Sequence, residues 1–258
     1  MAVKKTKKLS GQTTVTTINS TDKFPITDAN GKVTLVSLAT LKASILDGMS
    51  LNGMYDGIFI MYHRKSDNFP LMVKPHKWTS LQSSGEIADG VVVVEGGKVL
   101  VVAPTEATSK LTWSSAAISG GGTTTSDRVT AMNDWNGKAN TASQISKSTS
   151  SAVTNTASYA PGFCNLYSRA NANGNGLTAG KWWLPSLGEM MMIYANMTKI
   201  NYALSLISGA TQLVEDAYWT STESSAPYAW YLGLSTGAGN TTKASSTSRV
   251  RAVSAFIS

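Results

Sequence analysis

The sequence predicts an α+β fold for residues 51–258, preceded by a small separate module over residues 1–50. Three observations predict this class. Apolar strand-like runs separated by turn signals begin at Gly57, and similar runs return from Tyr218 to the C-terminus. Between them, Ser186 begins a segment whose apolar residues recur at helical spacing. A chain of 258 residues, 42% of them hydrophobic, is large enough to bury a substantial core around such elements.

The N-terminal module is predicted to contain two short strands and a short helix. Strand patterns cover 24–26 and 32–36, and the sequence Asp-Ala-Asn-Gly at 28–31 is a strong turn signal between them. Ser37 is a candidate N-cap for a helix that Gly48 would end. The apolar residues at helical spacing in this segment are Leu38, Leu41, Ile45 and Leu46. Because the module is too small to hold a core alone, we expect it to pack against copies of itself or against another protein.

Four strands are predicted between Gly57 and Val102. The first two cover 58–62 and 71–74, and Pro75 marks the end of the second. The other two cover 91–94 and 99–102 and flank Glu-Gly-Gly-Lys at 95–98, which is a hairpin signal. Since both of these runs are apolar at consecutive positions, we expect this hairpin to be buried on both faces.

The central region is predicted to hold helices separated by polar loops. Residues 127–145 have a helical pattern that Gly137 weakens, and loops are expected at 146–158 and 171–180. The strongest helix start is the capping box formed by Ser186 and Glu189. Apolar residues at helical spacing follow it, and Gly209 is expected to end the helical region. These residues are Leu187, Met190, Met191 and Tyr194, then Ile200, Ala203, Leu204 and Ile207. The methionines are interpreted as core residues.

Three strands are predicted near the C-terminus, at 218–221, 229–234 and 250–256. In the second, Trp230, Leu232 and Leu234 alternate with Tyr231, Gly233 and Ser235. Because side chains of a strand alternate between its two faces, we expect one apolar face and one exposed face.

The charge and composition argue against nucleic acid and membrane partners. The net charge is +7, but Lys4, Lys5, Lys7 and Lys8 supply four of these charges, which leaves +3 for the other 250 residues. No aromatic residues interleave with this lysine cluster, as binding of single-stranded nucleic acid would require. Residues 9–20 lack the apolar core of a signal peptide, and no apolar stretch approaches the length of a membrane span. We therefore expect a protein made in the cytoplasm, without a signal peptide or membrane insertion.

Several sequence blocks together resemble the variable proteins of diversity-generating retroelements, which include bacteriophage tropism determinants with a C-type-lectin fold. The resemblance covers about residues 52–258. The blocks are YDGIFIMYHRKSDNFPLMVKPHKW at 55–78, DGVVVVEGGKVLVVAP at 89–104, WWLPSLGE at 182–189, YWTSTE at 218–223, AWYLGL at 229–234 and RVRAVSAF at 249–256. The resemblance implies a C-type-lectin-like domain, similar to formylglycine-generating enzymes, with two helices around twisted antiparallel sheets. It also implies a variable segment near the C-terminus on one exposed face.

Residues 224–248 fit such a variable segment. Of these 25 residues, 17 are Ser, Thr, Ala or Gly, and only Lys243 is charged. In the family, variation arises at template adenines, chiefly in Asn codons, and this mechanism cannot produce Lys, Glu, Gln, Met or Trp. Trp230 and Lys243 are therefore expected to be fixed scaffold positions, together with Trp219, Arg249 and Arg251. The predicted ligand-facing residues are Ser224, Pro227, Tyr228, Tyr231, Gly233, Ser235, Thr236, Ala238, Gly239, Asn240, Thr241, Ser245, Ser246 and Ser248.

The resemblance implies a receptor-binding protein of a virion, on a tail fibre or tail tip. Its implied partners are a host-cell surface receptor, either protein or glycan, and other virion proteins contacted through residues 1–50. A homotrimer is implied by the similarity to tail proteins. Tyrosines supply rigid contact area in such a surface, and small polar residues supply adaptable hydrogen bonds. An alternative is a structural virion or surface protein whose Ser/Thr-rich loop binds no ligand.

The sequence predicts no catalytic, metal or cofactor site. The segment 233–237 matches the nucleophile-elbow pattern, but no helix pattern or histidine follows it. His63 and His76, the only histidines, are interpreted as structural residues at the surface or at strand ends. The Asn-rich segment 171–176 resembles the start of a calcium loop, but Trp182 occupies the position of its final Glu. A formylglycine-generating type of oxidase is disfavoured because Cys164 is the only cysteine, and we expect it to be a small buried residue.

Overall fold

The computed structural model describes residues 22–27, 30–40, 55–148 and 152–256, and the chain divides into two compact units, 1–50 and 51–258. In the first unit, β1 (Lys23–Thr27) pairs antiparallel with β2 (Val33–Ser37). Residues 38–40 are helical, and Ser37 Oγ accepts a hydrogen bond from the Thr40 amide at 3.1 Å. The other residues predicted for this helix, Leu41, Ile45 and Leu46, lie outside the described residues. Several apolar side chains of this hairpin are exposed, namely Ile26, Val33 and Leu35.

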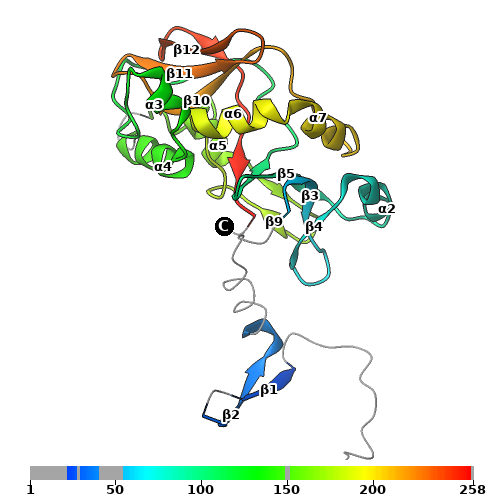
Figure 1. Ribbon diagram of the computed structural model, residues 1–258. Helices are drawn as coiled ribbons and strands as arrows, with labels where there is room; N and C mark the ends of the chain where they lie inside the picture. The colour runs from blue at the N-terminus through cyan, green and yellow to red at the C-terminus, as the bar shows by residue number, and fades with distance from the viewer. Residues whose placement is uncertain (1–21, 28–29, 41–54, 149–151, 257–258) are drawn as a thin grey trace, which may run out of the picture. The chain divides into compact units, whose positions relative to one another are not determined.

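The second unit is built around an antiparallel sheet of five strands (Figure 1). Its strands, in spatial order, are β14 (Val253–Ser254), β6 (Lys98–Val102), β5 (Ala88–Glu95), β3 (Gly57–His63) and β4 (Pro70–Val73). The β5–β6 hairpin has the predicted turn, because Glu95 pairs with Lys98 and the two glycines between them have φ angles of +55° and +75°. Residues 91–94 are all buried, as expected for strands covered on both faces.

Two apolar clusters pack on this sheet. The first contains Val91, Val93 and Leu100 together with helix residues such as Leu187 and Ile200. The second contains the alternate residues of the same strands, such as Val92 and Val101, and three large side chains: Trp113, Trp182 and Trp219. Since neighbouring residues of β5 belong to different clusters, the sheet separates two cores. The architecture is therefore α+β, with several antiparallel sheets.

The helices are short. They are the 3-10 turn η1 (Pro75–Lys77), α2 (Trp78–Ser83), α3 (Arg128–Met132), α4 (Gly137–Lys147), α5 (Ala160–Leu166), α6 (Leu187–Ala195) and α7 (Met197–Ser205). The capping box at Ser186 and Glu189 is present as predicted, and α6 begins there. Helix α7 packs against β3 and β5, whereas α6 packs against a second sheet (Figure 1). No helix in the described part of the chain combines the length and apolarity needed to cross a membrane.

The prediction of a single helix over 127–145 is wrong, because the helix is interrupted between α3 and α4. Asp134 stands in the break, where its side chain accepts a hydrogen bond from the Asn136 amide at 3.0 Å. Gly137 then begins α4 in direct contact with the start of α6. A Cβ atom at Gly137 would lie 2.0 Å from Glu189 Oε2, so this approach requires glycine. Helix α4 also extends to Lys147, into the predicted loop at 146–158.

The second sheet contains β10 (Ala217–Glu223), β11 (Tyr228–Gly233) and β12 (Gly237–Thr242), in that order. Two smaller ladders join β7 (Leu111–Thr112) to β13 (Thr247–Ser248) and β8 (Arg169–Ala170) to β9 (Gly176–Leu177). The predicted strand at 250–256 is wrong in extent, since only Val253 and Ser254 form regular pairs there, with β6. The reason is that the carbonyls of Val250 and Ala252 accept hydrogen bonds from the amides of Ala107 and Ala103, in the loop after β6, and form no regular ladder.

Candidate ligand-binding surface

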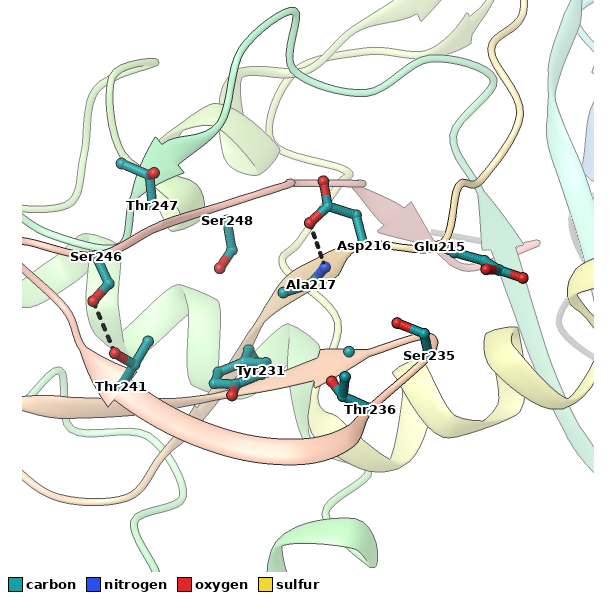
Figure 2. Close-up of a pocket in the computed structure, with 11 residues that line it drawn as sticks. Glu215, Asp216, Ala217, Tyr231, Ser235, Thr236, Thr241, Ser246, Thr247 and Ser248 are labelled. Carbon is teal, nitrogen blue, oxygen red and sulfur yellow. Dashed lines mark hydrogen bonds between the residues drawn. The ribbon is translucent and has the colours of Figure 1, made fainter.

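An open cavity of about 410 Å³ lies between the β11–β12 hairpin and the segment that leads into β13. Its lining is rich in hydroxyl groups and has carboxylates at one end. The lining residues are Glu215, Asp216, Ala217, Tyr231, Gly233, Ser235, Thr236, Thr241, Ser246, Thr247 and Ser248. Figure 2 shows that Tyr231, Ser235 and Thr236 approach from the hairpin, whereas Ser246, Thr247 and Ser248 lie across from them. The predicted variable segment therefore supplies most of this cavity.

The half-buried ring of Tyr231 forms the aromatic part of the cavity wall. It contacts Trp219 edge-to-face, with ring centroids 6.5 Å apart and an interplanar angle of 81°. Gly239 lies opposite Tyr231 in the ladder, and a Cβ atom at Gly239 would lie 2.6 Å from the tyrosine oxygen. The Tyr231 ring therefore occupies space that is open because Gly239 has no side chain.

The far wall is a polar turn held together by its own hydroxyl groups. Thr241 Oγ1 lies 2.8 Å from Ser246 Oγ, and Thr242 Oγ1 lies 2.6 Å from Ser245 Oγ. The Ser246 amide also donates to the Thr242 carbonyl at 3.2 Å. These bonds link the end of β12 to the residues just before β13 through hydroxyl and backbone groups.

An ion-pair network borders the carboxylate end of the cavity. Asp216 Oδ1 accepts from Lys110 Nζ at 2.9 Å, and Asp216 Oδ2 accepts from Arg249 Nε at 3.0 Å. Burial alone would raise the pKa of Asp216, but the hydrogen bonds from Lys110, the Ala217 amide and Arg249 lower it overall. Asp216 is therefore ionised at neutral pH, and its charge is balanced by its neighbours. Glu215, beside it, is exposed.

A fully buried ion pair fixes the base of the hairpin. Lys243 Nζ donates to Glu223 Oε2 at 2.5 Å, and both side chains are 0% exposed. The same ammonium donates to the carbonyls of Ile118 at 2.7 Å and Ala226 at 2.9 Å, and it lies 4.5 Å from the centroid of the Trp113 ring. Burial lowers the pKa of Lys243, and the hydrogen bond and charge of Glu223 oppose this effect. Three chain segments that are distant in sequence thus meet at one cation.

The other predicted scaffold residues are also held in place. Trp230 is 2% exposed and donates through Nε1 to the Thr125 carbonyl at 2.8 Å. Trp219 is buried and donates to the Leu111 carbonyl at 2.8 Å. Arg251 is buried and donates to Glu106 at 3.1 Å and to the Ala103 carbonyl at 3.0 Å. Arg249 is partly exposed and joins Glu106 to Asp216.

The predicted ligand-facing residues fall into two sets. The cavity contains Tyr231, Gly233, Ser235, Thr236, Thr241, Ser246 and Ser248. Outside it lie Ser224, Pro227, Tyr228, Ala238, Gly239, Asn240 and Ser245, of which Tyr228, Asn240 and Ser245 are exposed. The ligand-binding role of both sets stays a prediction.

Three of these positions differ from the expected exposed display. Gly233 and Ser248 are buried although they line the cavity, so the face of β11 opposite Trp230 is only partly open. A Cβ atom at Gly233 would lie 2.1 Å from Thr236 Oγ1, which restricts substitution there. Ala238 packs against the first core cluster, because it pairs with Leu232, whose side chain is on the core face of the sheet.

Sequence reasoning missed several parts of the site. Glu215, Asp216, Ala217 and Thr247 line the cavity but were not among the candidates. Glu223, the partner of Lys243, was not identified either. The one available signal for Glu223 was that it is the only charged residue in the strand pattern that it ends. Nothing local in the sequence connects Asp216 to the turn at 242–248.

The motifs set aside in the sequence have structural roles here. The segment 233–237 is the hairpin turn between β11 and β12, which is not the strand-to-helix turn of a nucleophile elbow. His63 is buried at the end of β3, where its Nδ1 lies 2.6 Å from Asp89 Oδ2. Asn171 Oδ1 accepts hydrogen bonds from the amides of Asn173 and Asn175 within its own loop. No group of three His, Cys, Asp or Glu side chains in the described ranges is placed to hold a metal ion.

Cys164 is buried in α5, as expected, and burial raises the pKa of its thiol.

Comparison of the chain with protein-family models, curated proteins and solved structures found no match.

Proposed function

We propose that this protein is a bacteriophage receptor-binding protein, carried on a tail fibre or tail tip, that binds a host-cell surface molecule. In this proposal residues 51–258 form a C-type-lectin-like domain. The β11–β12 hairpin and the turn at 242–248 form a ligand-binding surface diversified by a retroelement. Residues 1–50 attach the domain to the virion.

One observation carries this proposal: in the predicted variable segment, both residues that codon diversification cannot produce, Trp230 and Lys243, are buried. Trp230 is 2% exposed and the Lys243 side chain is 0% exposed. Around them, Tyr228, Ser235, Thr236 and other small polar residues are at the surface. A fixed interior beneath a replaceable surface is the arrangement that a diversified binding site requires.

The chemistry of the surface supports attachment through many weak contacts. Tyr228 is 41% exposed and Tyr231 borders the cavity, and tyrosine gives contact area at a small entropic cost. The remaining residues are small, so one site is expected to bind modestly. A homotrimer, and several copies on one virion, would convert modest sites into firm attachment through effective concentration.

Sequencing of the gene and of a propagated phage population tests the diversification. The proposal expects a reverse-transcriptase gene and a near-copy of the 3′ end nearby, with adenines at the codons of the surface positions. It expects Trp230 and Lys243 to stay constant while Tyr231 and Asn240 vary. A neighbourhood without the near-copy, or a population in which Trp230 varies as often as Asn240, contradicts it.

A binding assay tests the attachment. The full chain is incubated with host cells, and the variant Tyr228→Ala/Tyr231→Ala is expected to bind at least about tenfold more weakly. Tyr202→Ala is the matched control, because Tyr202 is 56% exposed on α7 and does not line the cavity. Equal binding by the double variant and the control would support the structural alternative, a virion protein whose loop has no ligand.

A further inference from the structure

A second cavity lies between one face of α6, the α3–α4 connection and the β5–β6 turn. It is an apolar groove of about 450 Å³ whose walls include Met132, Trp135, Met191, Met192 and Ala195. A deeper cavity of about 150 Å³ shares Trp135, Met192 and Lys98 with the groove and also contacts Glu189. Because the two spaces share three lining residues, they lie next to each other. None of its lining residues belongs to the surface proposed for receptor binding.

Trp135 distinguishes this groove from the rest of the molecule. Six of the seven tryptophans are buried, whereas Trp135 is 36% exposed. Its neighbours on the groove wall are methionines, which are flexible and adapt to bound apolar groups. An exposed indole beside methionines at a concave surface is typical of a small-molecule site.

The buried carboxyl group of Glu189 provides a polar anchor in the deeper cavity. Glu189 is 6% exposed, and its Oε2 accepts from the Ser186 amide at 2.8 Å and from Trp183 Nε1 at 3.1 Å. Among the described residues, no hydrogen bond to this carboxyl group falls on Oε1. A carboxyl group has acceptor capacity on both oxygens, so Oε1 is available to a ligand.

We propose that this groove and the deeper cavity bind a small neutral aromatic alcohol, of the phenol type. The ring packs against Trp135 and the methionines, and the hydroxyl group hydrogen-bonds with Glu189 Oε1. The groove, at about 450 Å³, has the volume of a small-molecule site, so the ligand proposed here is a free small molecule. Lys98 lines both spaces and disfavours a cation, whereas Glu95 and Glu189 disfavour an anion.

Binding is expected to depend on pH. Burial raises the pKa of Glu189 to about 7; the charge of Asp134 adds to this effect, and hydrogen bonds from Ser186 and Trp183 oppose it. The other charged groups near the site are Lys98 and Glu95 of the β5–β6 hairpin, and Lys138, whose Nζ lies 5.7 Å from the centroid of the Trp183 ring. A hydroxyl donates more strongly to a carboxylate than to a neutral acid, so phenol binding should tighten above pH 7.

The test uses the full chain with methionine methyl groups labelled for NMR, and p-cresol and toluene as probes. We expect p-cresol to shift the methyl signals of Met132, Met191 and Met192. At pH 8 its affinity should be about tenfold higher than that of toluene, and this ratio should decrease toward pH 6. Glu189→Gln keeps the capping box and should remove the pH dependence of the ratio. Trp135→Ala should weaken both probes.

Tyr194→Ala is the control for Trp135→Ala, because Tyr194 is an exposed aromatic on the same helix as the groove wall but does not line it. Met191→Gln repeats the test of the apolar wall if Trp135→Ala loses the dispersed methyl spectrum of the folded protein. Shifts confined to other methionines, equal affinities for the two probes, or p-cresol binding unaffected by these variants would overturn the proposal. Tighter binding of benzylamine than of p-cresol would also overturn it.

Discussion

Replacing Lys243 by alanine should strongly destabilise the unit formed by residues 51–258. The change removes the counter-charge of Glu223, three hydrogen bonds from Nζ and the cation over the Trp113 ring. Removing one partner of a buried ion pair costs about 3–5 kcal/mol, because the other charge is left uncompensated away from water. Since the free energy of unfolding of a domain is only about 5–15 kcal/mol, this loss is a large part of the total stability.

Urea denaturation followed by tryptophan fluorescence measures this effect, since Trp113 lies beside the cation. The matched control is Lys110→Ala, which removes a pair with Asp216 whose lysine side chain is 46% exposed. An exposed pair of this kind contributes about 0–1 kcal/mol. Both variants delete a lysine from an ion pair, but the Lys243 pair is fully buried whereas the Lys110 pair is partly exposed.

A second substitution separates the charge from the packing. In Lys243→Ala/Glu223→Gln, no uncompensated charge is buried. The amide oxygen can still accept from the Gly120 amide at 2.7 Å, while the longer bond from the Gly122 amide to the second oxygen, at 3.3 Å, is lost. We expect the double variant to recover about 1–3 kcal/mol of the loss, which is the usual cost of an unsatisfied buried group. If Lys243→Ala costs no more than Lys110→Ala, or if Glu223→Gln restores nothing, the buried charge does not hold the hairpin.

Three further predictions concern Glu189 and two glycines. Because burial raises the pKa of Glu189 to about 7 from 4.5, the folded state binds this proton more tightly than the unfolded state. Stability should therefore fall by up to about 3 kcal/mol between pH 4.5 and 7, and Glu189→Gln should remove this slope in urea titrations. Gly137→Ala places a Cβ 2.0 Å from Glu189 Oε2 and should cost about 1–3 kcal/mol in the same assay. Gly239→Ala should displace the Tyr231 ring, which tyrosine ring NMR signals would report, and under the proposed function it should weaken host-cell binding. Unchanged Tyr231 signals in that variant would contradict the packing described for the cavity.

The elements that were predictable from the sequence are those with a local physical cause. Two glycines can adopt positive φ angles in a two-residue turn, so the hairpin at 91–102 could be predicted from its sequence. The capping box of Ser186 and Glu189 is contained within four residues, and it correctly gave the start of α6. Burial of Trp230 followed from strand alternation.

The parts that were missed depend on contacts between segments that are distant in sequence. The break before Gly137 exists because the start of α6 approaches there, and a periodicity pattern over 127–145 contains no information about that contact. The cavity is formed when the turn at 242–248 meets residues 215–217 across the sheet. Pairing of β13 with β7 joins residues more than a hundred positions apart, and no local signal specifies such a partner.

The packing of the hairpin restricts which surface positions can vary independently. Tyr231 and Gly239 are ladder partners, and the tyrosine ring occupies the space that a side chain at Gly239 would need. A larger residue at 239 therefore requires a smaller residue, or a moved ring, at 231. Asn240 and Ser235 are exposed, so we expect that they can change one at a time. Under the proposed function, we therefore expect free variation at the turns and outer edge and coupled variation at the cavity wall.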